Sequence, residues 1–283
     1  MNMKVKQSHI SVLEALAEYR FLTPSQFVKL GIRSDVSNMN KILREMKNKA
    51  KPDIENIDLK KKAGNGSFEY VYYLSETGKR KLIEDLGVFK ESIKAPKKTT
   101  QPYYPNDFPH RLGTMNFQIM VHTWADSQQV DIKEFRLYFE KEPKNQGLKK
   151  GITRTTVQYD KDKIIHPDSV IKLSIDKREI VVLFEYHRGF DIKKFERQAE
   201  AHIEAMKSGK VKERFATDRP SRVLWVFEEE TAMRTAMKRL REDRSYEQLT
   251  EAFLFKSYKE VEQELFHNWL TFNGRRLTLM GTP

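Results

Sequence analysis

The sequence predicts an α/β protein of two domains, and three observations support this. The chain has 283 residues, 39% of them hydrophobic, which is enough to bury two ordinary cores. Its front third has apolar residues at helical spacing, followed by a glycine-rich turn. The rest alternates strand-like and helix-like segments, which predicts helices covering a central mixed sheet. We expect one domain at residues 1–96 and a second at 97–283, joined by a proline-containing linker at about 90–108.

The front domain is predicted to begin with three short helices. Apolar spacing in His9–Arg20 predicts the first, and Thr23-Pro24 is a helix-start signal for a second that reaches about Leu30. A third helix follows in SDVSNMNKILREMKNKAK, with Ser34 as the expected cap. Its apolar residues face inward. Its outward face carries the basic residues Lys41, Arg44, Lys47 and Lys49.

A basic hairpin is expected next. The segment IDLKKKAGNGSFEYVYYL alternates and turns at Gly64-Asn65-Gly66, where positive φ angles cost little. Its first arm carries Lys60, Lys61 and Lys62, and an amphipathic helix from Ser75 to about Leu86 closes the unit. Three helices and a basic hairpin form the order of a winged helix-turn-helix, which places one helix in the major groove of DNA. The alternative is a protein-contact domain in which the lysine run is a solvated turn.

The charge distribution favours double-stranded DNA as the partner. The chain has 52 Lys and Arg against 40 Asp and Glu, a formal charge of +12. Residues 1–105 hold 20 basic and 12 acidic residues, so most of the excess lies in the front third. A membrane surface attracts the same charge, but no apolar run approaches the roughly 20 residues of a span. The start, MNMKVKQSHI, lacks a signal-peptide core, so we expect a cytoplasmic protein without a membrane partner.

The back domain is expected to open with a helix at His110 and to close with a hairpin about a second Asn-Gly turn. Two further helices are expected at 191–209 and 229–243. The expected strands span residues 132–139, 155–159, 164–175, 178–186, 221–228 and 250–258.

Acidic residues interrupt two of these apolar strands. Asp168 follows Pro167, and strand alternation puts Glu185 and His187 on one face. If the two strands are hairpin neighbours, Asp168 and Glu185 converge, and two carboxylates suit Mg²⁺ or Mn²⁺. The absence of cysteine also limits any metal site to carboxylates and imidazoles. The alternative is that Asp168 is an ordinary strand entry and that Glu185 pairs with Arg188 or with a structural histidine.

A proline-aspartate pair followed by E-x-H resembles the PD-(D/E)xK nuclease core. The resemblance implies that Asp168 and Glu185 are metal ligands and that a lysine two positions after the second acid stabilises developing negative charge. Here that position is His187, which is not a permanent cation at neutral pH. Lys193 or Lys194, at the start of the next helix, could supply the charge instead.

Five segments in order, YYLSETGKRKL, HRLGTMNFQI, HPD, LFEYHRG and FLFKSYKEVEQELFHNWLTFNGRRLTL, resemble the replication-relaxation family of plasmid and mobile-element proteins. The likeness runs from about His9 to Leu279. It implies plasmid replication or DNA relaxation and a restriction-endonuclease-like core, as in one class of conjugative relaxase. It also implies catalytic roles for His110 and Gln198, whose ordinary alternatives are a helix-start residue and a surface residue. The remaining histidines of the back domain, His122, His166 and His202, are expected to be structural.

Two functions follow from these features. In the first, the winged helix finds a site on mobile-element DNA and the back domain nicks it with a divalent metal. In the second, the protein regulates replication or transcription, and the nuclease-like core is a scaffold or homodimerisation platform. His187 favours the regulator, and the two acids favour metal-dependent nicking. Of the two functions, we favour nicking. The sequence has no Gly-rich phosphate loop, H-E-x-x-H or G-x-S-x-G, which argues against P-loop ATPases, zinc proteases and common serine hydrolases.

Overall fold

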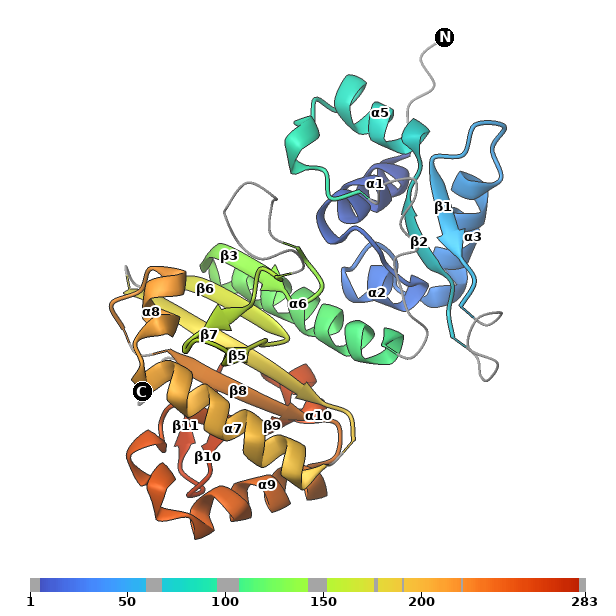
Figure 1. Cartoon of the computed structure of the whole chain (residues 1–283). Coiled ribbons are helices and arrows are strands. Elements are labelled where there is room, and N and C mark those ends of the chain that lie inside the picture. The colour runs from blue at the N-terminus through green and yellow to red at the C-terminus, as the bar shows by residue number, and fades with distance from the viewer. Residues whose placement is uncertain are drawn as a thin grey trace. The chain divides into compact units, whose positions relative to one another are not determined.

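The computed structural model describes residues 6–59, 68–95, 107–141, 152–175, 178–189, 191–219 and 221–279. It divides into two compact units, Met1–Arg111 and Leu112–Pro283, and each is described by itself (Figure 1). The predicted α/β class is confirmed, with helices in both units and a large sheet in the second. The boundary near residue 97 stays a prediction. None of the described helices is long and apolar enough to cross a bilayer.

The first unit contains the three expected helices, α1 (Gln7–Tyr19), α2 (Pro24–Lys29) and α3 (Val36–Lys47). Thr23 caps α2 in a reciprocal capping box with Gln26, as its Thr-Pro start predicts. The expected cap of α3 was wrong by one residue. The side chain of Asp35, not of Ser34, accepts the backbone N–H of Asn38 at 2.8 Å.

Two strands follow, β1 (Ile54–Ile57) and β2 (Val71–Leu74), which pair antiparallel with Ile54 opposite Leu74. Ser75 caps the closing helix α5 (Glu76–Glu84), and a short 3₁₀ turn, η1, spans Lys90–Ser92. The predicted Gly64-Asn65-Gly66 turn lies outside the described residues. The helix and strand order agrees with a winged helix-turn-helix, which remains a prediction without the turn.

The second unit is built on a seven-stranded sheet in the order β11-β10-β9-β8-β7-β6-β3. The three central strands β7, β8 and β9 run parallel and the other neighbours are antiparallel, so the sheet is mixed as predicted. Its strands are β3 (Asp131–Leu137), β6 (Ser169–Ile175), β7 (Arg178–His187), β8 (Arg222–Phe227), β9 (Phe253–Ser257), β10 (Trp269–Thr271) and β11 (Arg276–Leu277).

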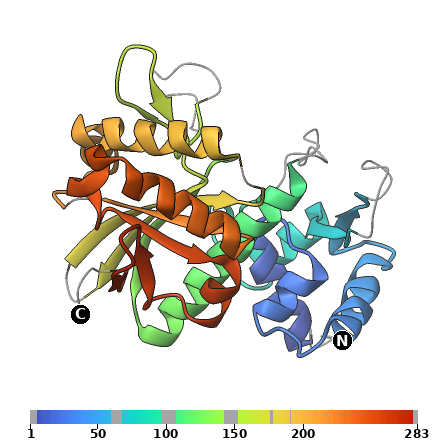
Figure 2. The same cartoon turned by 90° about the horizontal axis from the view of Figure 1, so that it is seen from below.

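Helices cover both faces of this sheet (Figures 1 and 2). One face packs on α7 (Ile192–Lys207), α8 (Lys210–Phe215) and α9 (Glu230–Glu242) through a core that includes Phe195 and Trp225. The other face packs on α6 (Phe108–Gln128) and α10 (Tyr258–Gln263) through Phe117 and Phe184, whose rings stack 3.7 Å apart. A short 3₁₀ segment, η2, spans Arg244–Leu249. The short helices α8 and α10 were not predicted.

Residues 164–175, expected as one strand, form two. β5 (Ile164–Ile165) pairs with β4 (Val157–Gln158) in a separate small sheet, and β6 begins only at Ser169. Pro167 lies between them. Proline has no N–H for a strand ladder, which explains the interruption. The break places Asp168 immediately before β6, beside the end of β7.

Candidate metal site

The hairpin of β6 and β7 brings the two predicted acids together. The strands pair antiparallel with Ser169 opposite Phe184, so one further step along the register places Asp168 opposite Glu185. Directly opposed residues in an antiparallel pair have Cβ atoms about 5 Å apart. Glu185 shares its face with Leu183, which lies in the core beneath α7. Asp168 and Glu185, called the acid pair below, therefore lie under α7, and the expectation that their strands are neighbours is confirmed.

Asp168 is fixed by hydrogen bonds on both its side chain and its backbone. Its Oδ2 accepts the backbone N–H of Tyr186 at 2.7 Å, and its carbonyl oxygen accepts the N–H of Tyr138 at 3.0 Å. The residue is only 8% exposed. Asp168 therefore has a structural role, because its carboxylate accepts a backbone N–H of β7, and its role as a metal ligand stays a prediction.

Glu185 is 3% exposed, and its partner is a histidine rather than Arg188. Its Oε1 lies 2.6 Å from Nε2 of His202 on α7, whereas Arg188 lies 3.6 Å from Glu228. Burial and the nearby charge of Asp168 raise the pKa of Glu185 well above its usual value, while the charge of Lys194 acts in the opposite direction. Burial, and then the proximity of His187, lowers the pKa of His202 to about 3, so His202 is neutral near pH 7.

His187, in the lysine position of the motif, is packed among aromatic rings. Its ring stacks on Phe227 with centroids 4.8 Å apart, and Trp225 and Phe195 lie at 5.4 and 5.9 Å. A cation near the acids comes instead from Lys194, whose charge stabilises the Glu185 carboxylate. Lys193, the other sequence alternative, and Lys194 are both exposed, and of the two it is Lys194 whose charge lowers the pKa of Glu185.

Lys194 belongs to a regular row on α7. Lys194, Gln198 and His202 are spaced four residues apart, which places them on one side of the helix. Asp191 caps α7 by accepting the N–H of Lys194 at 3.0 Å, and this fixes where the row begins. Gln198 is half-buried, and its Oε1 has no hydrogen-bond partner among the described residues. The sequence analysis treated His202 as structural and left a structural histidine open as the partner of Glu185, but it did not assign that pairing to His202, although the four-residue spacing from Gln198 was a usable signal.

The other predicted residues lie elsewhere. His110 is half-buried in the first turn of α6, within Met1–Arg111, so it is not placed relative to the acid pair. His122 packs edge-on against Phe135, and Nδ1 of His166 lies 2.8 Å from the hydroxyl of Thr156. These two contacts agree with structural roles.

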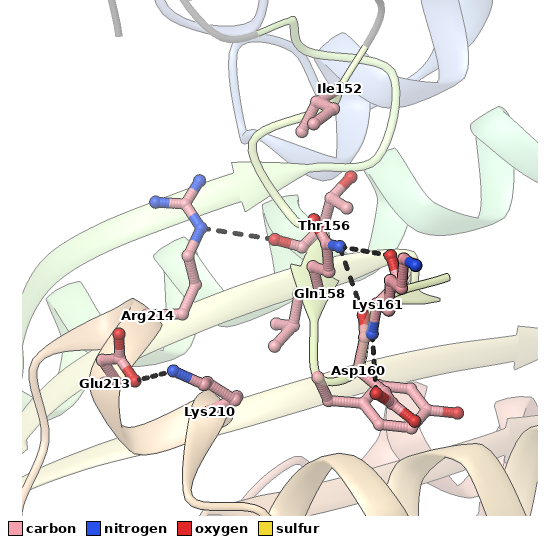
Figure 3. Close-up of a pocket in the computed structure, with 10 residues that line it drawn as sticks. Ile152, Thr156, Gln158, Asp160, Lys161, Lys210, Glu213 and Arg214 are labelled. Carbon is pink, nitrogen blue, oxygen red and sulfur yellow. Dashed lines mark hydrogen bonds and ion pairs between the residues drawn. The ribbon is translucent and has the colours of Figure 1, made fainter. Parts of the chain in front are cut away.

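A hollow of about 550 Å³ lies between the β4 segment and α8, away from the acid pair (Figure 3). Its rim includes Lys210, which pairs with Glu213 at 2.6 Å, and Arg214, which donates to the Thr156 carbonyl at 3.3 Å. Neither acid lines it. Asp168 and Glu185 are 8% and 3% exposed, so only a small part of either residue is open to solvent.

The donor set of the acid pair fits a hard divalent cation. In the described part of the chain no group of three or more His, Asp or Glu is placed to hold a metal. Mg²⁺, however, is often held by one or two carboxylates with waters and phosphate oxygens. Of the two Glu185 oxygens, Oε1 is hydrogen-bonded and Oε2 makes no hydrogen bond to a described residue. A cation between the acids would also offset the repulsion that raises the pKa of Glu185.

The predicted DNA-contacting residues in the first unit fall into three groups. Lys41, Arg44 and Lys47 are exposed on α3. Lys49 lies beyond the end of α3, and its Nζ bonds the buried carboxylate of Asp53 at 2.5 Å. Lys60, Lys61 and Lys62 lie outside the described residues. Of the predicted residues that the structure describes, Lys41, Arg44 and Lys47 are therefore the exposed ones, and their contact with DNA stays a prediction.

Fold and site together define an α/β protein with a buried acid pair at the end of one sheet hairpin and a basic helix in a separate unit. The chain belongs to the replication-relaxation family, whose model matches residues 13–207, more than half of the sequence. Membership indicates a role in the replication or relaxation of plasmids or mobile elements and an interaction with DNA. No curated protein and no solved structure matches the chain.

Proposed function

We propose that the protein binds double-stranded DNA of its plasmid or mobile element and nicks it with a divalent metal held by Asp168 and Glu185. The opposed acid pair is the observation that carries the proposal, because two buried carboxylates repel each other unless a proton or a cation lies between them. Mg²⁺ or Mn²⁺, when bound, would polarise a phosphodiester and lower the pKa of a water.

The chain's own residues have separate roles in this mechanism. Asp168 and Glu185 hold the ion, and Glu185 must first release the proton that its raised pKa favours. Lys194 stabilises negative charge as it develops on the phosphate, in place of the lysine that the motif would have at His187. His187 supports the site by packing against Phe227.

The first unit supplies the affinity for DNA. Lys41, Arg44 and Lys47 project from the exposed side of α3, where their charges would release counterions from a phosphate backbone. The predicted wing would add Lys60, Lys61 and Lys62. Binding by this unit would bring a DNA site to the second unit of the same molecule.

The alternative is a replication or transcription regulator whose nuclease-like unit is a scaffold or homodimerisation platform. One observation favours it: the acid pair is largely buried, and aromatic rings pack around His187 at the position of the motif lysine. In such a protein the acid pair would hold a proton rather than a cation.

A nicking assay separates the two functions. The substrate is supercoiled plasmid that carries the origin region of the element encoding this chain, incubated with Mn²⁺ or Mg²⁺. We expect nicking by the wild type, none by Asp168→Asn or Glu185→Gln, and normal nicking by Glu242→Gln, which changes an exposed carboxylate on α9. All four proteins should shift the same DNA in a gel. Normal binding without nicking by the wild type would establish the regulator.

A further inference from the structure

We infer that His202 is a positioning residue that fixes the Glu185 carboxylate so that one oxygen is kept for the metal, an inference that rests on the proposed function. Nε2 of His202 lies 2.6 Å from Oε1 of Glu185, and the two side chains are 2% and 4% exposed. A contact this short and this buried restricts the carboxyl group to one orientation. The second oxygen, Oε2, is then the one that faces a ligand.

The unpartnered ring nitrogen decides which atom holds the proton. Nδ1 of His202 is buried without a hydrogen-bond partner among the described residues. A buried N–H with no acceptor loses a hydrogen bond that it made in water, which costs roughly 1–3 kcal/mol. Leaving Nδ1 without a proton costs less free energy than burying an N–H there without an acceptor. Nδ1 is therefore the nitrogen without a proton, and Nε2 carries the proton that His202 donates to Oε1 of Glu185.

Packing prevents the ring from turning away. His202 meets Trp225 edge-on, with centroids 5.4 Å apart at 80°, and Trp225 is fully buried in the middle of the sheet. The capped helix α7 sets the position of His202 along the strand. Carboxylates that bind a metal are usually held by outer-shell hydrogen bonds, and loss of such a partner typically costs 10–100-fold in metal affinity or activity.

Two substitutions distinguish positioning from simple core filling. His202→Leu keeps an apolar side chain of similar size under Trp225 but cannot donate a hydrogen bond. His202→Gln retains an N–H at nearly the same distance along the side chain. A purely structural histidine would tolerate leucine at least as well as glutamine, whereas a positioning donor would be replaced only by glutamine.

The experiment measures Mn²⁺ binding to the full chain by electron paramagnetic resonance without DNA, alongside thermal unfolding. We expect Mn²⁺ affinity to fall 10–100-fold in His202→Leu and to recover to within a few-fold of wild type in His202→Gln. Equal Mn²⁺ affinity in all three proteins would overturn the inference and leave the proposed function intact. Absence of Mn²⁺ binding by the wild type would overturn both.

A second measurement needs neither a variant nor a metal. Nitrogen-15 spectra of the histidine rings in the metal-free wild type report which nitrogen of His202 is protonated. The inference requires protonated Nε2 and bare Nδ1. The opposite tautomer would overturn it even if His202→Leu proved too unstable to study.

Discussion

The backbone N–H of Tyr186 donates to Oδ2 of Asp168 at 2.7 Å. Tyr186 directly follows Glu185, so the chain next to one acid of the pair fixes the side chain of the other. This side-chain bond extends the contact between β6 and β7 beyond Ser169 and Phe184, the last backbone pair at this end of the two strands. Asp168 therefore combines a structural bond with its proposed metal role, and the two can be separated by substitution.

Asp168→Asn and Asp168→Ala should differ in stability but not in metal binding. Asparagine keeps an acceptor for the Tyr186 N–H, whereas alanine leaves that buried donor unpaired, which costs roughly 1–3 kcal/mol. We expect chemical denaturation to show near-normal stability for asparagine and a clear loss for alanine, with Mn²⁺ binding abolished in both. Equal stability of the two variants would contradict the structural role of the bond.

The contact between α6 and β7 predicts the effect of a small substitution. A Cβ built on Gly113 would lie 2.1 Å from Cε1 of Tyr186, which is too close for any real contact. We expect Gly113→Ala to destabilise the protein by roughly 1–3 kcal/mol because the clash outweighs the gain in helix propensity. Gly189→Ala is the control, since nothing lies within 4 Å of its Cβ position. Thermal unfolding of both variants measures the difference.

Much of the architecture could be predicted because it depends on local patterns. Capping residues such as Thr23 and Ser75 and the apolar alternation in β7 and β8 locate elements by side-chain chemistry alone. The short helices α8 and α10, six residues each, have too few turns for a periodic pattern to develop. They depend on packing against elements distant in sequence.

The candidate site was only partly predictable for the same reason. Strand alternation and a hairpin were enough to bring Asp168 and Glu185 together. These patterns did not identify the partner of Glu185. That partner, His202, comes from α7, 17 residues away, and Arg188 was equally compatible with the sequence. The packing of His187 on Phe227 depends on the parallel pairing of β7 with β8, which no local pattern specifies.

The buried ion-pair cluster in the first unit predicts a pH dependence. Burial alone would raise the pKa of Asp53, but hydrogen bonds from Lys49 and Lys81, each 2.5 Å long, outweigh it and hold the pKa below its usual value. A lowered folded-state pKa contributes stability that is present above the unfolded pKa and lost as pH falls through the folded one. Stability of the wild type should therefore decline below about pH 4.

Asp53→Asn should remove that part of the acid dependence and destabilise the protein near pH 7. Asp85→Asn, at an exposed position after α5, should leave both unchanged. Urea denaturation at a series of pH values measures the slope. An unchanged slope in Asp53→Asn would show that the ion pairs with Lys49 and Lys81 contribute nothing to acid stability.

The exposed basic face of α3 predicts the salt dependence of DNA binding. Removing one side chain that binds a phosphate should reduce the slope of log affinity against log salt concentration by about 1. We expect this from Lys41→Ala, Arg44→Ala and Lys47→Ala, whose side chains are exposed on α3. Lys238→Ala on α9 is the control for the removal of one surface charge, and its slope should equal that of the wild type.

Lys49→Ala tests whether Lys49 stabilises the fold instead of binding DNA. Because Lys49 bonds Asp53, its removal should lower stability and leave the salt slope nearly unchanged, unlike the α3 variants. Fluorescence anisotropy with labelled duplex DNA at several salt concentrations, together with thermal unfolding, gives both quantities. A full reduction in slope for Lys49→Ala, with normal stability, would mean that Lys49 leaves Asp53 and contacts phosphate when DNA binds.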